Sequence, residues 1–181
     1  MSLLYCGRYK ARFRRVCNHI GQADVVELCF GDIFIASFCK KNKLHWTGYD
    51  INKSFVKRAK KKGYHAILAD ITTIDKFREA EICLMMGSFY HFFDNFEEIL
   101  KKMLDCSKRV IISEPIKNLS GRNDVIGSIA KRSANAGKRV ENFRFTEKTL
   151  IEILDKCSEK FNFKYQIDKR LKKDIIIIIE K

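Results

Sequence analysis

Five short runs of apolar residues recur at nearly even intervals along the chain. They begin near Val25, Leu44, Tyr64, Glu81 and Lys108, and charged segments of helix-compatible composition separate them. Strands that alternate with helical segments at this spacing are typical of βαβ units, in which helices cover both faces of a parallel sheet. The pattern therefore predicts an α/β fold with a mostly parallel sheet.

The segments between the apolar runs carry signals for helix ends. One helix is expected from Asn52, a capping residue, to Gly63, which suits a helix stop. Residues 94–107 have a cap, acids in the first turn and lysines later, as the helix dipole favours. A short helix is expected around 74–78, and Thr146 is expected to cap a later one.

Both ends of the chain and one internal segment depart from this cadence. Residues 1–22 predict an amphipathic helix with apolar side chains on one side and Arg8, Arg12 and Arg15 on another. Residues 116–145 are rich in glycine and asparagine, and we interpret this long segment as a lid or substrate-facing insert. The C-terminus predicts two strands joined by a charged hairpin, within a single domain spanning 1–181.

Length and composition narrow the classes of protein that need to be considered. A chain of 181 residues with 46% hydrophobic content predicts one packed domain. No apolar stretch approaches the roughly 20 residues that span a bilayer, so no membrane association and a cytoplasmic location are expected. The seven cysteines are widely spaced and form no CxxC pair, which favours buried, reduced thiols over a metal site.

The charge of the chain raises the question of an anionic partner. Lys and Arg total 36 against 22 Asp and Glu, a net charge of +14. A basic surface gains affinity for nucleic acid by displacing counterions, so RNA is a candidate partner. Lysine-rich helix faces that are simply solvated are the alternative, and the sequence leaves both open.

Polar residues end the predicted strands, at the edge where α/β sheets bind ligands. The acids Glu27, Asp50 and Asp70 follow the first three runs, and Asp50 lies 19 positions after Gly31. That spacing is close to the roughly 20 residues expected before an acid that receives ribose hydroxyls. We expect Asp50 to accept from a ribose diol and Asp70 from an adenine amino group. Glu27 would cap turn amides or attract a cationic amino group.

In this order the strand ends resemble the class I S-adenosylmethionine-dependent methyltransferases, small seven-stranded members in particular. The resemblance rests on the segments VVELCFGD, GYDIN, LADI, CLMMGSFYHFFDNFEEILKKM and VIISEP. It implies a Rossmann-like three-layer αβα sandwich, a mostly parallel seven-stranded sheet with a C-terminal antiparallel hairpin, and S-adenosyl-L-methionine as cofactor. The cofactor-binding residues that it implies are Glu27, Cys29, Gly31, Asp50, Ile51, Asp70, Ile71, Met86, Gly87 and Ser88.

The first motif departs from the family pattern at two glycines. Cys29 and Ile33 stand where the family favours the first and third glycines. Cysteine is small enough for this turn if Cys29 need not adopt a positive φ. A nicotinamide-dependent dehydrogenase is the nearest competing enzyme, but its motif requires a small residue where this chain has Phe34.

Methyl transfer asks mainly for alignment of the acceptor with an already activated methyl group. Two residues are candidate catalytic groups: His91, to orient or deprotonate an acceptor, and Glu114, as an acid at the acceptor site. A packed histidine and a structural carboxylate are the alternatives. The acceptor stays open between a small molecule and RNA or protein. A non-catalytic binding or scaffolding protein of the same fold is the alternative function, favoured by the missing glycines.

Overall fold

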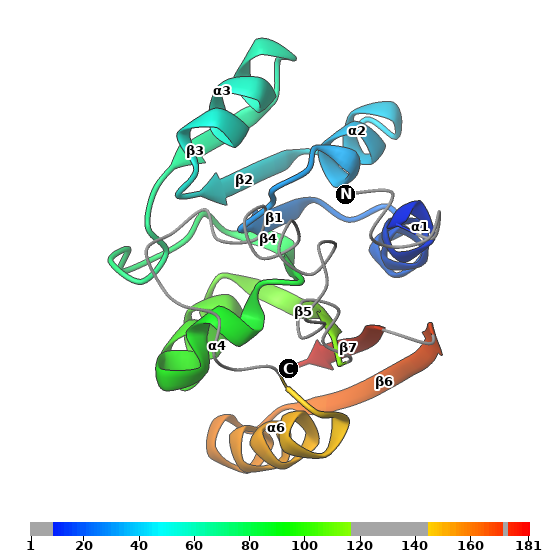
Figure 1. Ribbon diagram of the computed structural model, residues 1–181, viewed down its shortest axis with the longest axis vertical. Coiled ribbons are helices and arrows are strands. Elements are labelled where there is room, and N and C mark those ends of the chain that lie inside the picture. The colour runs from blue at the N-terminus through cyan, green and yellow to red at the C-terminus, as the bar shows by residue number, and fades with distance from the viewer. Residues whose placement is uncertain (1–8, 117–144, 172–173) are drawn as a thin grey trace, which may run out of the picture.

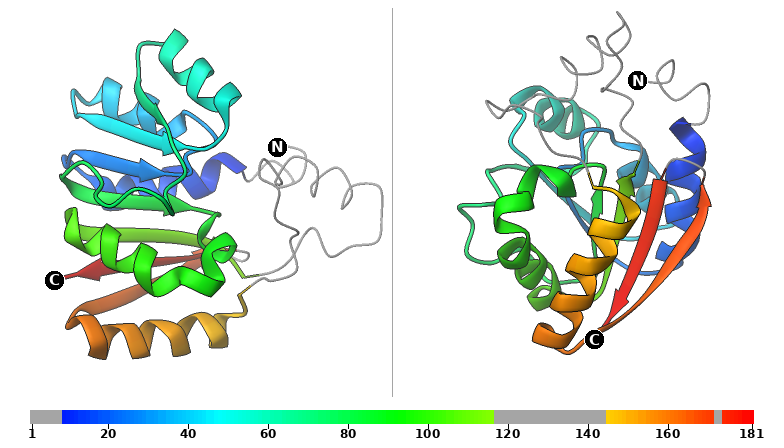
Figure 2. Two further views of the ribbon diagram at one scale, coloured as in Figure 1. Left: turned by 90° about the vertical axis from the view of Figure 1, so that its left-hand side faces the viewer. Right: turned by 60° about the horizontal axis from the view of Figure 1, so that its bottom comes forward.

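The computed structural model describes residues 9–116, 145–171 and 174–181, which form one seven-stranded sheet with helices on both faces (Figures 1 and 2). The strand order is β3-β2-β1-β4-β5-β7-β6. The first five strands are parallel, and β7 runs antiparallel to both β5 and β6. The predicted α/β sandwich with its C-terminal antiparallel hairpin is confirmed.

The strands follow the apolar runs closely. Each of the first five begins within two residues of its predicted start. Their bounds are β1 Val25–Leu28, β2 Trp46–Asp50, β3 His65–Leu68, β4 Ala80–Met86, β5 Ser107–Pro115, β6 Lys164–Leu171 and β7 Asp174–Glu180.

Two hydrophobic cores lie on the two faces of the sheet. Helices α1, α2 and α3 pack on one face, and α4 and α6 pack on the other. The helices are α1 Tyr9–Ile20, α2 Phe34–Lys41, α3 Lys53–Lys61, α4 Phe96–Asp105 and α6 Glu147–Phe161. Successive isoleucines of β7 alternate between the two cores, because a strand covered on both faces buries every side chain.

Most of the predicted helix ends are confirmed, but one helix begins later than expected and one expected helix does not form. Asn52 caps α3 through its side chain, and Thr146 caps α6. The helix expected from residue 94 begins at Phe96, after a 3-10 helix at Phe89–Asn95. Residues 74–78 form no helix, and this segment is irregular as far as β4.

The N-terminal helix is described only from α1 onward, and the expected insert at 116–145 falls almost wholly outside the described residues. No helix in the described part of the chain has both the length and the apolar composition needed to cross a bilayer.

Candidate functional site

Asp50 lies at the carboxyl edge of the sheet, as the last residue of β2. One carboxylate oxygen, Oδ2, accepts from the backbone N–H of Gly31 at 3.0 Å, and Oδ1 accepts from that of Asn52 at 2.8 Å. Burial raises the pKa of the Asp50 carboxyl, and these two hydrogen bonds oppose the shift. A carboxylate has about four lone-pair positions, so Asp50 can also accept from two hydroxyls of a ligand. It thus holds the turn after β1 and keeps acceptor capacity.

Exposed apolar side chains lie beside Asp50. Ile51 follows it directly and is 52% exposed, and Leu68, opposite Asp50 in the β2–β3 register, is 45% exposed. Asp70 lies two residues farther on, where its Oδ1 accepts from the backbone and hydroxyl of Thr72. The apolar side chains of Ile51 and Leu68 could contact a flat aromatic ring. The carboxylates of Asp50 and Asp70 could accept hydrogen bonds from hydroxyl or amino groups attached to that ring.

Ile71 was expected among the cofactor-binding residues, and the structure corrects this for its side chain. It is only 3% exposed and belongs to the core on the α4 side of the sheet. The Asp70 turn directs it inward, so it supports the edge from beneath rather than forming a binding surface.

The turn after β1 keeps a glycine-type backbone despite its missing glycine. Cys29 has φ +53° and Gly31 has φ +51°. The condition that Cys29 need not adopt a positive φ is therefore not met. Cys29 adopts the left-handed conformation, which costs roughly 1–2 kcal/mol for a residue with a Cβ. Its N–H donates to the Tyr49 carbonyl at 2.7 Å, which helps to hold that geometry. Ile33 follows as the N-cap position of α2 and packs partly buried against the core.

Glu27 lies deeper than its position in the motif suggests. It sits within β1, opposite Gly48 and Leu84, and its side chain is fully buried. Its Oε2 accepts from the Trp46 indole N–H at 2.8 Å, whereas Oε1 is buried without a hydrogen-bond partner among the described residues. Burial raises the pKa of Glu27 well above its usual range. The carboxyl therefore serves the indole, and the expected capping of the turn amides is wrong.

Trp46 reaches Glu27 because β2 has a glycine beside it. A Cβ added to Gly48 would lie 2.1 Å from the Trp46 ring and 2.7 Å from the Phe30 ring. A glycine inside a strand often marks such a close approach, and this is the sequence signal that points to Trp46. Trp46 is thus an unanticipated supporting residue beneath the site.

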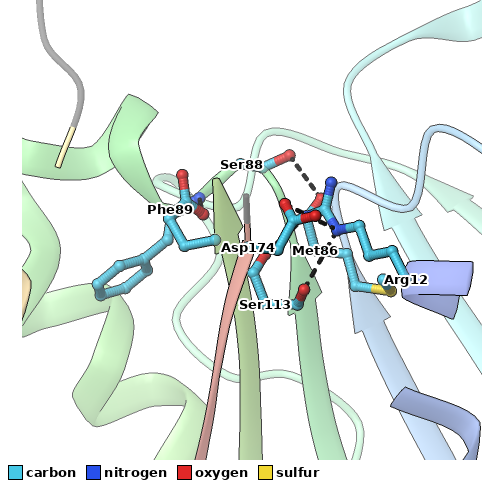
Figure 3. A network of polar contacts seen from close by, with 7 residues as sticks. Arg12, Met86, Ser88, Phe89, Ser113 and Asp174 are labelled. Atoms are coloured by element: carbon cyan, nitrogen blue, oxygen red, sulfur yellow. Dashed lines mark hydrogen bonds and ion pairs between the residues drawn. The ribbon is translucent and has the colours of Figure 1, made fainter. Parts of the chain in front are cut away.

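The β4–β5 part of the edge is covered by a buried arginine (Figure 3). Gly87 has φ +66°, and its N–H donates to the Ser113 carbonyl at 2.7 Å. Arg12, from α1, donates from Nε to the Ser113 hydroxyl at 3.1 Å and from Nη2 to the same carbonyl at 2.7 Å. A Cβ on Gly87 would lie 2.7 Å from that Nη2.

Arg12 corrects the expected arrangement of the N-terminal helix, in which it shared a side with Arg8 and Arg15. It is 5% exposed, and its Nε lies 3.6 Å from Asp174 Oδ1 at the start of β7. Buried charges require such partners. The spacing of basic residues along 1–22 does not distinguish Arg12, because its acceptors come from distant strands.

The two candidate catalytic residues differ in their surroundings. Glu114 is fully buried, and its carboxylate accepts from the backbone N–H of Phe89 at 3.1 Å and of Tyr90 at 3.4 Å. Its oxygens hold the start of the 3-10 helix, which is the structural alternative, and its role at the acceptor site stays a prediction. His91 is half-buried beside Tyr90, with ring centroids 3.9 Å apart, and its catalytic role stays a prediction.

The remaining expected residues lie at the edge where their motif places them. Met86 ends β4 and is half-buried, and the Ser88 hydroxyl donates to its carbonyl at 3.5 Å (Figure 3). The structure thus gathers Asp50, Ile51 and Asp70 on one side of β1 and Gly87 and Ser88 on the other.

Comparisons with known proteins find the fold but no sequence relative. No family model matches the chain, and no curated protein matches it. Among solved structures, the methyltransferase domain of bacterial CtHen1 has a TM-score of 0.72 at 18% identity, covering 93% of this chain and 96% of that chain. The DhpI–SAH complex has a TM-score of 0.73 at 14% identity, covering 99% and 87%.

A third structure, of a SAM-dependent methyltransferase from Archaeoglobus fulgidus, has a TM-score of 0.67 at 16% identity, covering 95% of this chain and 92% of that chain. Similarity at this level of identity concerns the fold. The described residues therefore have the Rossmann-like fold of the class I methyltransferases, as the strand-end motifs imply.

Proposed function

We propose that the protein is an S-adenosylmethionine-dependent methyltransferase. The observation that carries the proposal is Asp50: a carboxylate at the end of β2, bonded to the Gly31 turn and bordered by exposed apolar surface. The strand order places this carboxylate next to the turn after β1, where dinucleotide and nucleoside ligands bind in related sheets. The structurally similar DhpI contains SAH, the product form of this cofactor.

The residues at the edge fit the two halves of S-adenosylmethionine. Asp50 would receive the ribose hydroxyls, Ile51 and Leu68 would flank the adenine ring, and Asp70 would accept from its amino group. The amino acid half would lie between the turn at Cys29–Gly31 and Gly87, both of which present positive-φ backbone. The Arg12 guanidinium occupies the space that a Cβ on Gly87 would fill, so the amino acid half would meet Arg12 beside this backbone.

The bound cofactor would supply an activated methyl group on a sulfonium. The protein's part is then to hold the adenosine through Asp50, orient the acceptor at the β4–β5 edge and exclude water. In this proposal His91 would orient the acceptor, or take its proton if the acceptor is protonated at neutral pH. Glu114 supports this region by fixing the backbone of Phe89 and Tyr90.

Two competing functions make different predictions. A nicotinamide-dependent dehydrogenase with a doubly wound sheet has the strand order 3-2-1-4-5-6, whereas here the antiparallel β7 lies between β5 and β6. Phe34, at the position that such enzymes keep small, packs against Phe13 with centroids 5.1 Å apart. A non-catalytic scaffolding protein would keep the fold without binding the cofactor.

Calorimetric titration separates these functions. Wild-type protein is expected to bind S-adenosylmethionine and S-adenosylhomocysteine but not NAD. Asp50→Asn removes the charge that strengthens hydrogen bonds from the ribose, so we expect about tenfold weaker binding of both ligands. Asp105→Asn, which alters an exposed acid on α4, is the matched control and should bind as wild type does.

Folded wild-type protein that binds none of the three ligands would overturn the proposal in favour of the scaffold. Binding of NAD alone would overturn it in favour of the dehydrogenase.

A further inference from the structure

More than half of the net charge of the chain is concentrated in residues 40–62. This segment contains nine basic residues and a single acid, Asp50, which gives it a net charge of +8 out of +14. All nine basic side chains are exposed. We call them the α2–α3 basic surface: Lys40, Lys41, Lys43, Lys53, Lys57, Arg58, Lys60, Lys61 and Lys62.

The two halves of this surface are neighbours in space. The Lys40 ammonium, from α2, lies 5.5 Å from the centroid of the Tyr64 ring, which follows α3. The same ammonium would lie 3.8 Å from a Cβ on Gly63. The two helices lie near one edge of the sheet, on the β2–β3 side of the molecule (Figure 1). The basic residues at the end of α2 therefore lie beside those at the end of α3.

The basic side chains of this surface lack the acidic partners that lysines have elsewhere in the protein. Within the described ranges none of the nine forms an ion pair, whereas lysines on α4 and α6 do. Those pairs are Lys101–Asp105, Lys102–Glu98, Lys148–Glu152 and Lys160–Glu97. Like charges at i, i+4, such as Lys53 and Lys57, destabilise a helix by a few tenths of a kcal/mol. A lysine-rich composition alone does not explain why the acids are missing here.

The surface also reaches the candidate site. The Arg58 Nη2 donates to the Gly31 carbonyl at 2.6 Å, in the turn that Asp50 holds. Lys53 begins α3 three residues after Asp50, and the helix extends about 14 Å from there. A chain that followed α3 would therefore have one end next to the proposed cofactor site.

Aromatic side chains between the cations favour one class of polyanion. Arg58 lies over the Phe55 ring at 5.3 Å, and Phe55 and Tyr64 are both half-buried. Nucleic-acid bases stack on aromatic rings and on arginine planes while lysines contact the phosphates. A membrane surface would require apolar side chains on the exposed face of α3, but Val56 and Ala59 are buried against the sheet.

We propose that the α2–α3 basic surface binds single-stranded nucleic acid and leads it toward the carboxyl edge of the sheet. The binding surface stands on charge, exposure and aromatic placement. The consequence that nucleic acid is the methyl acceptor rests on the proposed methyltransferase function.

Fluorescence anisotropy with a labelled oligouridylate of about 12 nucleotides, without cofactor, tests the surface. The test variant is K57Q/K60Q/K61Q on α3. The control is K148Q/K156Q/K164Q on α6 and β6, which removes the same charge from exposed positions at the other end of the sheet. Glutamine keeps a similar helix propensity.

The affinity of wild-type protein should fall with salt, with a log–log slope of about −3 if four phosphates are neutralised. The test variant should bind at least about tenfold more weakly at low salt, and its slope should be shallower by about 2. The control should stay within about twofold of wild type, because distant charges are screened beyond a Debye length.

Equal losses in the two variants would show that only net charge matters and would overturn the proposal. So would absence of binding by wild type, or tighter binding to duplex than to the single strand. Polyglutamate or phosphatidylserine vesicles that bind with the same dependence on α3 would reassign the surface to an acidic protein or a membrane.

Titration of K57Q/K60Q/K61Q with S-adenosylhomocysteine keeps this proposal separate from the proposed function. Unchanged binding of S-adenosylhomocysteine with loss of the oligonucleotide supports the surface. Oligonucleotide binding by a wild type that binds no S-adenosylhomocysteine would retain the surface and remove the methyltransferase.

Discussion

Glu27 illustrates at the scale of one residue how depth in the sheet changes a carboxyl group. Its position in the motif after the first apolar run is readable from the sequence, but its burial depends on neighbouring strands. β1 lies between β2 and β4, and the Trp46 indole covers one carboxylate oxygen. The result is a fully buried carboxyl whose pKa is raised chiefly by burial.

We therefore predict a pH dependence of stability that Glu27→Gln removes. A folded-state pKa above the unfolded value of about 4.5 means that the native state binds the extra proton. The stability of wild type relative to the variant should be greatest below pH 4.5, the unfolded-state pKa. It should fall as the pH rises, by at most about 1.4 kcal/mol per pH unit until the folded pKa is passed.

Urea denaturation of both proteins between pH 4 and pH 8 measures this difference. The glutamine side chain of the variant retains an oxygen that can accept from Trp46, so the comparison isolates the titration. A difference in unfolding free energy that stays constant, or that grows in favour of wild type as the pH rises, would contradict it.

The sequence also indicates which residues stand at strand ends, and this accounts for what could be predicted of the site. An apolar run and its polar end are adjacent in the chain, so the sequence alone predicts which residues lie at the strand ends. This local signal identifies Asp50, Ile51, Asp70 and Gly87. Arg12 could not be placed, because its acceptors lie on β5 and β7. For the same reason the sequence does not show that Glu114 is occupied by the backbone of another segment.

At the scale of elements, α1 is fastened to the sheet by more than its apolar face. Phe13, Val16 and Ile20 pack in the core shared with α2 and α3. Arg12 adds a buried contact with Ser113 and Asp174, at the carboxyl edge of β5 and the start of β7. The helix therefore has both an apolar and an ionic attachment.

Arg12→Met should destabilise the protein by about 3 kcal/mol, because it leaves the Asp174 carboxylate buried without this cation. Asp174 is 5% exposed, so water does not replace the lost partner. Arg14→Met changes an exposed arginine on the same helix and should have an effect near zero. Chemical denaturation of the two variants provides the comparison, and equal stabilities would show that the Arg12 contact contributes nothing.

The sequence predicts helix boundaries correctly where a local side chain caps the helix. It does not predict them where a tertiary contact determines the backbone conformation. Asn52 and Thr146 cap their helices with their own side chains, so their sequence signals suffice. The segment before β4 does not form the short helix expected near 74–78. Phe77 is buried there, and the Arg78 N–H donates to the Tyr49 hydroxyl at 3.1 Å. These contacts hold the backbone in an irregular course.

At the scale of the whole molecule, the fold follows from βαβ alternation and was predictable in outline. The parallel strands bring their carboxyl ends to one edge, and the antiparallel β7 begins at the same edge. The proposed cofactor would therefore contact segments that are distant in sequence, from the turn after β1 to the end of β4. A ligand of this kind stabilises the folded state as a unit.

S-Adenosylhomocysteine at 100 times its Kd should stabilise the protein by about 2.7 kcal/mol. For a chain of this size the expected increase in Tm is roughly 5–10 °C. Differential scanning calorimetry should detect the shift in wild type and not with NAD at the same concentration. An unchanged Tm in the presence of S-adenosylhomocysteine would argue against a cofactor site in the native protein.

The uninterrupted isoleucine run of β7 has a consequence for how that strand is aligned. Because Ile175 to Ile179 are buried on both faces, a slip by one residue would exchange the faces yet bury nearly the same groups. The burial of apolar side chains thus hardly differs between the two registers of β7. Polar contacts at the two ends of the strand favour the observed register. Arg109 meets Glu180 at 3.1 Å at one end, and Arg12 meets Asp174 at the other. The charged residues at the two ends of β7 therefore distinguish its native register from one shifted by a residue.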